Sequence, residues 1–475
     1  MPVRCAARNA APARARRRPP LAGEDRGAAP DGYRRRRPEE TVLYQVVQEH
    51  LATFLEQARE RSPYGAGLPR SVESEFEAYL DCGILARGFT RVRCVECGNE
   101  LLVGFSCKRR GICPSCNARR MHDTAAHLVD RVFPLDVAVR QWVLSLPFQV
   151  RWLLARRGPL RREVLKIFLR TILAWQRRTA GVRRGRGGAV VLTQRFGSLL
   201  NLNLHFHALV LEGVYAARES DGAAVFLPVR PPTTQEVAEI AAKVAARVRR
   251  LFQRRGLADE PCDDSEVSAL DAAQSAALFG GVAFGPRAGK KVRRLGTGLT
   301  RPRRERPPLC AEVDGFDVHA GVAIAAHDRM GLERLARYGL RAPFALSRLS
   351  RAPHGRLSYE LKHPLDDGTT HLLFEPLELL EKLAVLVPPP REHLVTYHGV
   401  LAPCASLRDQ VVPEPPAPRP PGACSRRRGR PLRRIDWAAL REARLRPRDP
   451  HLRSLRRAHA RHLRHRGGAR RPQNT

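Results

Sequence analysis

The chain lacks any long apolar run. None of its uncharged stretches approaches the roughly 18 residues that a membrane-spanning helix requires, and no hydrophobic signal segment opens it. Lysine is scarce too, because only 7 of the 84 basic residues are lysine and the rest are arginine, a bias that GC-rich coding also produces. We therefore expect an intracellular bacterial protein without a membrane anchor.

Acidic side chains are the second deficit. The 475 residues hold 47 acidic against 84 basic side chains, which gives a net charge of +37. A protein that binds small neutral substrates has no need for the positive electrostatic field that this charge produces, whereas a polyphosphate is strongly attracted to it. Hydrophobic residues make up 43% of the chain, enough for a sizeable core. The composition predicts a folded, cytoplasmic, nucleoid-associated protein whose partner is nucleic acid.

Composition also divides the chain into a body and two basic ends. Residues 1–38 hold 11 arginines against 3 acids without periodicity, and residues 413–475 are rich in proline and arginine. Both are typical of disordered segments. Between them we predict an α+β protein, with a helical, cysteine-rich domain over 39–125 and a mixed domain over 126–412. Residues 257–310 are polar and rich in glycine and arginine, and we interpret them as a long connection.

Hydrophobic periodicity predicts the elements of the body. The predicted helices cover 41–59, 71–80, 162–177, 234–255, 328–340 and 377–385. The predicted strands cover 189–193, 199–211 and 316–325, with a hairpin formed by 357–362 and 371–374. Thr233 and Glu236 fit a capping box, so the start of the fourth helix is well defined.

Two Cys-x-x-Cys pairs stand 15 residues apart in the first domain. Cys94 with Cys97, and Cys113 with Cys116, would each offer two thiolates on one tight turn. Two such turns complete a tetrahedral zinc site of the zinc-ribbon kind, and the alternatives are two disulfides or chance. Nearby Cys82 and Cys107 are either extra ligands or buried thiols, and we favour buried thiols. Lys108, Arg109 and Arg110 make the surroundings basic, which fits either DNA contact or a solvated face.

A histidine pair marks the second domain. In the segment 203–209, polar and apolar residues alternate, so a strand would place His205 and His207 on one face. Two neighbouring imidazoles form half of a divalent-metal site and leave coordination positions open. Gln194 is the best-placed third ligand, although an ordinary polar residue at a strand end explains it equally well.

Phosphodiester chemistry also needs a nucleophile, and tyrosine can form a covalent phosphate ester. Tyr338 lies near the end of a predicted helix between Arg337 and Arg341, which could hold a phosphate while the phenol attacks. The alternative is a tyrosine that packs at a helix end. Tyr359 and Tyr397 are competitors, the first within a predicted strand and the second in a polar turn.

These features occur together in a known family. The chain resembles the HUH-type (His-hydrophobic-His) transposases of rolling-circle insertion sequences, including the common-region elements, from about Tyr33 to Pro413. The resemblance rests on ordered blocks: Cys94–Cys97, Ser106–Arg110, Cys113–Cys116, Arg140–Pro147, Gln194–Gly197, His205–His207, Arg337–Tyr338, Arg341–Pro343, Asp367–His371 and Tyr397–Pro403.

The resemblance implies a zinc-binding, DNA-contacting domain followed by a catalytic domain with an antiparallel sheet. The histidine pair would lie on a central strand, facing the tyrosine on a packed helix. By that resemblance, Mg²⁺ or Mn²⁺ at His205 and His207 polarises a phosphate of single-stranded DNA at the element ends and target. Tyr338 attacks and leaves a 5′-phosphotyrosine and a free 3′-hydroxyl. Relatives carry a histidine at the position of Gln194, which supports it as third ligand.

The chain departs from the family in two respects. Two-tyrosine members carry their tyrosines four residues apart, but Arg334 and Ala342 stand at that spacing from Tyr338. The resemblance then implies a single-tyrosine mechanism, in which strand transfer uses a second subunit or a 3′-hydroxyl. After Trp437–Leu440 the expected cysteine-containing segment is replaced by arginine- and histidine-rich sequence, which we interpret as a reading-frame slip.

Two other functions remain open at this point. A rolling-circle replication initiator or relaxase would share the metal and tyrosine chemistry and differ in its DNA target. A non-catalytic zinc-ribbon protein would bind DNA by charge alone, and its histidine pair would be structural.

Overall fold

The computed structural model describes residues 36–93, 100–257, 268–298 and 306–414. Most of the predicted N-terminal arm and nearly all of the predicted C-terminal tail lie outside these ranges. Arg36, which we assigned to the arm, belongs to the folded part, because its guanidinium donates to the carbonyl oxygen of Cys82 at 2.5 Å. None of the helices in the described part is long and apolar enough to span a bilayer.

A six-stranded antiparallel sheet forms the centre of the second domain, as expected. Its strand order is β14-β4-β5-β3-β10-β9. The strands are β3 (Val139–Ser145), β4 (Gly188–Phe196), β5 (Leu202–Leu211), β9 (Cys310–Val313), β10 (Phe316–Ile324) and β14 (Val395–Gly399). Every pairing within it is antiparallel. The strand that carries the histidine pair is therefore an inner strand, between β4 and β3.

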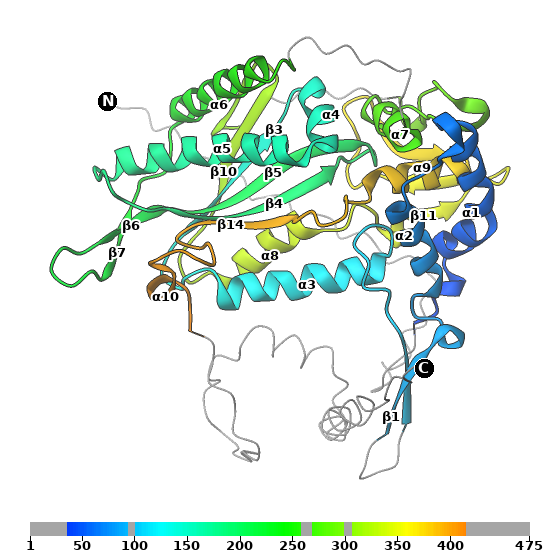
Figure 1. Cartoon of the computed structure of the whole chain (residues 1–475), viewed down its shortest axis with the longest axis horizontal. Coiled ribbons are helices and arrows are strands. Elements are labelled where there is room, and N and C mark those ends of the chain that lie inside the picture. Colours follow the sequence, from blue (N-terminus) through cyan, green and yellow to red (C-terminus); the bar gives the residue numbers. More distant parts are fainter. Residues whose placement is uncertain (1–35, 94–99, 258–267, 299–305, 415–475) are drawn as a thin grey trace, which may run out of the picture.

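Helices cover both faces of this sheet (Figure 1). On one side lie α5 (Gly158–Thr179) and α6 (Thr234–Arg254), and on the other lie α3 (Pro114–Arg131) and α8 (Arg329–Leu340). The alternation along β5 explains both layers, since Leu204 and Phe206 join the core beneath α5 and α6. Leu209 joins the core beneath α3 and α8.

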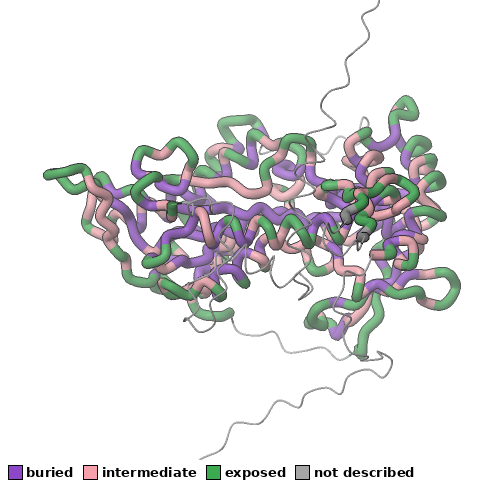
Figure 2. Tube along the Cα trace, turned by 90° about the horizontal axis from the view of Figure 1, so that it is seen from below, coloured by how far each residue is buried: buried purple, intermediate pink, exposed green. Residues whose placement is uncertain are grey.

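A third core unites the N-terminal helices with later segments. Figure 2 shows the buried residues running through the interior, with exposed residues along the outline. This third core contains residues of α1 (Val42–Glu60), α2 (Arg70–Asp81), α7 (Ala269–Leu278) and α9 (Pro376–Leu386). The same core covers a four-stranded sheet in the order β11 (Leu349–Arg351), β12 (Leu357–Glu360), β13 (Thr369–Phe374) and β8 (Arg293–Gly296). The spatial division thus differs from the one that composition suggested, because α1 and α2 pack on segments from beyond residue 126.

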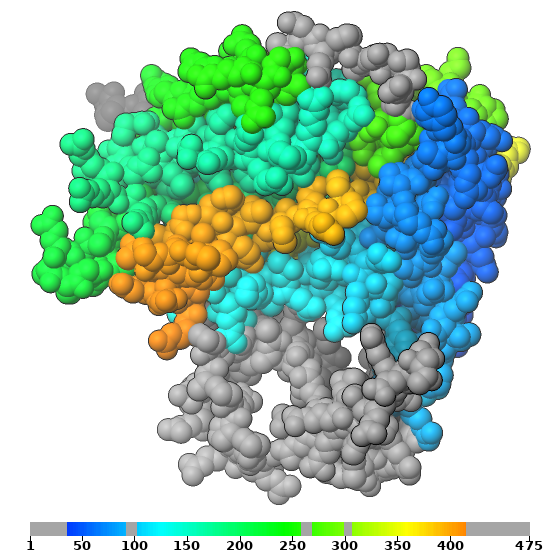
Figure 3. Space-filling model, in the orientation of Figure 1, coloured from blue at the N-terminus to red at the C-terminus, as the bar shows by residue number. Residues whose placement is uncertain are grey.

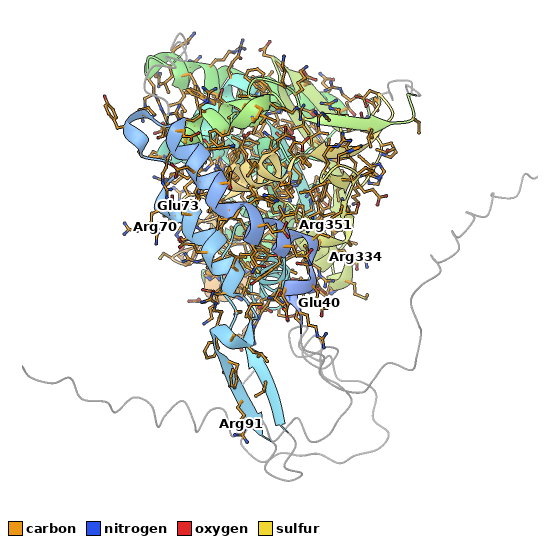
Figure 4. The ribbon with its side chains drawn as sticks, turned by 90° about the vertical axis from the view of Figure 1, so that its right-hand side faces the viewer. Glu40, Arg70, Glu73, Arg91, Arg334 and Arg351 are labelled. Atoms are coloured by element: carbon orange, nitrogen blue, oxygen red, sulfur yellow. The ribbon has the colours of Figure 1, made fainter. Side chains whose placement is uncertain are left out.

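Smaller elements complete the described chain. They are α4 (Phe148–Arg156), α10 (Arg408–Val411), the hairpin of β6 (Gly213–Ala217) and β7 (Ala224–Pro228), and the hairpin of β1 (Phe89–Arg93) and β2 (Glu100–Gly104). Figure 4 shows the β1–β2 hairpin extending away from the body, with Arg91 towards its far end.

The predicted helices and strands agree with the structure at most positions. The capping box of Thr233 and Glu236 is present at the start of α6, and Asp328 caps α8 by accepting from the backbone N–H of Gly331. The expected long connection is different, because its described part contains α7 and β8. The buried face of α7 consists largely of alanines, so its hydrophobic periodicity is weak, and Ser268 marks its start.

Candidate functional site

Four cysteine sulfurs form a compact cluster between α2 and α3. They belong to Cys82, Cys107, Cys113 and Cys116, and all lie within 4.8 Å of one another. Adjacent sulfurs are 3.5 to 3.6 Å apart. A tetrahedral zinc ion with bonds of about 2.3 Å holds its sulfur ligands about 3.8 Å apart. The cluster therefore has the donor set and the size of a closed zinc site.

Local structure brings these sulfurs together and favours the ionised form of Cys82. Cys113 is the N-cap of α3 and Cys116 lies in its first turn, so both thiols lie at the positive end of the helix dipole. Hydrogen bonds from the other three thiols lower the pKa of Cys82. The guanidinium of Arg36 lies 3.4 Å from the same sulfur. Thiolates are the form of cysteine that binds zinc, so these contacts suit a metal centre.

The set of cysteines differs from the one that spacing alone predicted. Cys113 and Cys116 are in the cluster, but their partners are Cys82 and Cys107, which we had interpreted as buried thiols. Cys94 and Cys97 lie outside the described residues, and their role as ligands stays a prediction. The Cys-x-x-Cys rule identifies pairs on one turn, whereas Cys82 and Cys107 come singly from the end of α2 and from the loop after β2.

The histidine pair lies on β5, on the face that α8 covers. The ring centroids of His205 and His207 are 4.9 Å apart. His207 is buried, with 4% of its surface exposed. Gln194 of β4 stands directly opposite His205 in the ladder, so its side chain lies on the same face. The alternation of the sequence thus predicted the shared face of the two histidines.

Hydrogen bonds engage one nitrogen of each imidazole and leave the other open. The Nδ1 of His205 donates to the carbonyl oxygen of Asn203 at 2.8 Å, and the Nδ1 of His207 lies 2.9 Å from the side-chain amide of Gln141. Within the described residues, the buried Nε2 of His207 and the buried Oε1 of Gln194 have no hydrogen-bond partner. Unpaired buried acceptors are costly, so the oxygen of Gln194 suits a bound cation. The Nε2 of His207 suits one in the tautomer with its proton on Nδ1, which requires the Gln141 amide to turn its oxygen towards that nitrogen.

Burial also keeps both imidazoles neutral. Desolvation lowers the pKa of His205 and lowers that of His207 to about 3, with a smaller contribution from the neighbouring His205. A neutral imidazole has a lone pair for a metal, and an imidazolium does not. The pair and Gln194 therefore fit a divalent ion that accepts nitrogen and oxygen ligands.

Tyr338 faces this pair from the last turn of α8. Its ring centroid lies 5.7 Å from that of His207, edge to face, and 43% of the residue is exposed. The guanidinium of Arg341 lies 4.4 Å from the centre of the phenol ring. Lys362 reaches the same ring from the segment after β12, with its Nζ 5.8 Å from the centre. The tyrosine is thus accessible and lies between two cations.

Gln194 also ties the strand to the helix end that carries the tyrosine. Its Nε2 donates to the carbonyl oxygens of Tyr338 and Gly339, at 3.0 and 2.8 Å. These carbonyls belong to the last turn of a helix, where they have no partner within the helix itself. A single amide thereby links the histidine site to the backbone of the turn that carries Tyr338.

The other tyrosines have different surroundings. Tyr359 is buried and its ring stacks on Phe344 at 5.2 Å, as expected for a packing residue. Tyr397 lies in β14, at the edge of the sheet. Neither has a recorded ring contact with the histidine pair in the described part of the chain.

The predicted DNA-contacting residues fall into two groups. Lys108 and Arg109 are exposed beside the cysteine cluster. Arg110 instead holds a later loop, donating to the carbonyl oxygens of Pro389 and Glu392. Arg337 contacts His122 of α3 and pairs with Glu333 at 3.5 Å. Arg341 lies beside the phenol, so Arg110 and Arg337 are the two of the five cations that are engaged within the protein.

Four further polar residues near the site were not identified from the sequence. Asp317 and His319 alternate on β10 and share the face of the histidine pair. The Asp-x-His spacing repeats the His-x-His pattern and could have revealed them. The proximity of Gln141 and Lys362 to the site could not be predicted, because each is brought there by a strand or loop distant in the sequence.

Comparison with known families agrees with both halves of this arrangement. A family model described as "Putative transposase" matches residues 188–408, which include the histidine pair and Tyr338. A second model, described as a transposase zinc-binding domain of the IS91 type, matches residues 46–146 and includes the cysteine cluster. No curated protein and no solved structure matches the chain.

Proposed function

Since the chain belongs to the IS91 family of transposases, whose partner is DNA, we propose that it cuts and rejoins single-stranded DNA through a covalent phosphotyrosine. The observation that carries the proposal is the position of Tyr338. Its exposed phenol lies edge to face with His207, at 5.7 Å between ring centroids, and on the same side of the sheet as His205. A nucleophile and an open metal half-site are what such a reaction requires.

His205, His207 and Gln194 would hold Mg²⁺ or Mn²⁺. The support is chemical, because the first two rings are neutral and Gln194 has a buried, unpaired oxygen among the described residues. When bound, the divalent ion supplies positive charge that polarises the scissile phosphate. Zinc suits the four cysteines instead, since their closed sulfur set leaves no position for a substrate.

The residues of the chain perform the bond exchange. The phenol oxygen of Tyr338, its proton released to water, attacks the phosphorus. The bond from phosphorus to the 3′ oxygen breaks, and that oxygen takes a proton from water, leaving a 3′-hydroxyl and a 5′-phosphotyrosine. Arg341 and Lys362 lie beside the ring and would balance the charge of the phenolate and the phosphate. The ester conserves the energy of the broken bond, so rejoining needs no nucleotide cofactor.

One tyrosine is enough for cutting, but joining requires a second acceptor. The residues four positions from Tyr338 are Arg334 and Ala342. Rejoining would therefore use a free 3′-hydroxyl or the tyrosine of a second copy of the chain. Exposed Lys108 and Arg109, beside the zinc centre, would hold the DNA backbone while this occurs, at element ends and target sites in the nucleoid.

A nicking assay tests the proposal. A labelled single-stranded oligonucleotide pool, incubated with Mn²⁺, should be cut by the wild type, with the 5′ end of one product attached to protein. Tyr338→Phe should abolish the adduct, and peptide mass spectrometry should find the nucleotide on Tyr338. Tyr64→Phe is the matched control, because Tyr64 is fully exposed at 101% and lies outside the site. Cutting by Tyr338→Phe at the wild-type rate would refute the mechanism.

A replication initiator or relaxase would share this chemistry. The match to a transposase zinc-binding domain over residues 46–146 favours the transposase. The match of residues 188–408 to a transposase model, together with the geometry around Tyr338, argues against a protein that only binds DNA.

A further inference from the structure

A cavity lies next to the sheet face that carries the histidine pair, and Gln194 is part of its lining. It has a volume of about 490 Å³ and is lined by parts of α3, β4, the end of α8 and β14. Such a volume lies within the range of small-molecule sites. In the space-filling view the segment that includes β14 lies directly beside α3 (Figure 3). The cavity is thus enclosed by elements of both family domains.

Its lining combines apolar walls with positive charge. The walls include Met121, Leu192, Phe196 and Val395. Four arginines line it as well, against one acid, Asp123; they are Arg110, Arg120, Arg195 and Arg341. A site for a small anion alone would need the arginines but not the apolar walls. A flat apolar group that carries a phosphate uses both features.

Two residues connect this cavity to the tyrosine. Arg341 lines the cavity, and its guanidinium lies over both the ring of Tyr338 and the ring of Phe196, at 4.4 and 5.6 Å. Gln194 lines it too and donates to the carbonyl oxygen of Tyr338. A nucleotide next to a phosphate at Tyr338 would therefore lie close to Arg341 and to this cavity.

We propose that this cavity binds one unpaired nucleobase of the DNA strand, next to the phosphate that Tyr338 attacks. The inference rests on the proposed function and adds a site of base recognition to it. The base is stacked between apolar walls, and its phosphates are held by Arg120 and Arg341. A base in a duplex is stacked on its neighbours and cannot enter, so the cavity selects for single strands.

Binding measurements test the base site without any cleavage. In a Tyr338→Phe background, the four 20-nucleotide homopolymers are compared with an abasic 20-mer that has the same phosphates. The measured quantity is the ratio of the dissociation constants for abasic and normal strands. Thr124→Trp places an indole in the cavity from α3 and should reduce this ratio about 5- to 100-fold for at least one base. Affinity for the abasic strand should not change.

Ala118→Trp is the matched control, because Ala118 is an exposed residue of the same helix and does not line the cavity. If circular dichroism shows that Thr124→Trp is misfolded, Met121→Trp replaces it. Equal weakening of both kinds of strand, or no preference for bases in the unmodified cavity, overturns the inference.

These outcomes are separate from those of the nicking assay. If the wild type shows no phosphotyrosine reaction but its base preference is lost in Thr124→Trp, the base-site inference stands and the proposed reaction fails. If the wild type forms the adduct but shows no base preference, the proposed reaction stands and the base-site inference fails.

Discussion

The four cysteines and the two histidines are the two candidate metal centres, and they differ in what they leave open. The cysteine cluster supplies four sulfurs within 4.8 Å of one another, a complete set for zinc. The histidines supply two nitrogens, and Gln194 adds an oxygen. The complete set lies at the start of α3 and is closed, whereas the incomplete set on β5 leaves coordination positions open, as the proposed reaction requires.

Removal of a cysteine ligand should have the largest effect. We expect Cys113→Ser to lose zinc and to unfold the N-terminal helices, because a structural zinc site contributes on the order of 10 kcal/mol to small domains. Zinc content and the thermal melting curve measure this. Cys404→Ser is the control, since Cys404 is exposed and lies outside the cluster. A Cys113→Ser protein that keeps its zinc and its melting temperature would disprove a closed site.

Loss of the Gln194 amide should impair the reaction more than the fold. Gln194→Leu leaves the carbonyl oxygens of Tyr338 and Gly339 without their donor. Because a displacement of about 1 Å can cost about 100-fold in rate, we expect kcat for nicking to fall by roughly that factor. Affinity for single-stranded DNA should stay within about twofold, and Gln149→Leu, at an exposed glutamine of α4, is the control. Unchanged kcat would show that the amide does not position the tyrosine.

Gln141 should affect metal affinity at the histidine pair through its contact with His207. Its amide lies 2.9 Å from the Nδ1 of that ring and sets the ring's orientation. Partners of this kind change metal affinity by about 10- to 100-fold. We expect Gln141→Leu to weaken Mn²⁺ binding, measured by calorimetry, while the zinc content stays constant. An equal loss of zinc would indicate general damage to the fold.

The smallest effect concerns pH. Burial lowers the pKa of His207 to about 3 from 6.5. Between these values the unfolded chain binds the proton more readily, so stability falls as the pH decreases from 6.5. We expect His207→Asn to have a shallower decrease in melting temperature between pH 6.5 and 4 than the wild type. The exposed His363 provides the control, since His363→Asn should retain the wild-type slope.

The two centres were not equally predictable from the sequence. Alternation along β5 is a local property, so the shared face of His205 and His207 follows directly from the order of residues. The cluster depends on Cys82 and Cys107, whose approach to Cys113 is set by tertiary packing of α2 against the loop after β2. Spacing rules describe ligands on one turn and do not extend to such contacts.

The same distinction explains the fold. Helices with a strong apolar face, such as α6, were predicted almost to the residue. The alanine face of α7 has too weak a hydrophobic periodicity to predict a helix. In the structure, α7 packs in one core with α9 and the N-terminal helices. Lys362 is the corresponding example in the site, because only the fold of the smaller sheet brings it to Tyr338.

The path of α3 has a consequence for the living cell. Its first turn is anchored by two of the clustered cysteines, and it packs along α8, which ends at the tyrosine. Oxidants that convert the thiols to disulfides, or a shortage of zinc, would free the first turn of α3. The packing of α3 on α8 would then change, and Tyr338 would be displaced. Mobilisation of the element would then fall under oxidative stress or metal starvation, without any dedicated regulator.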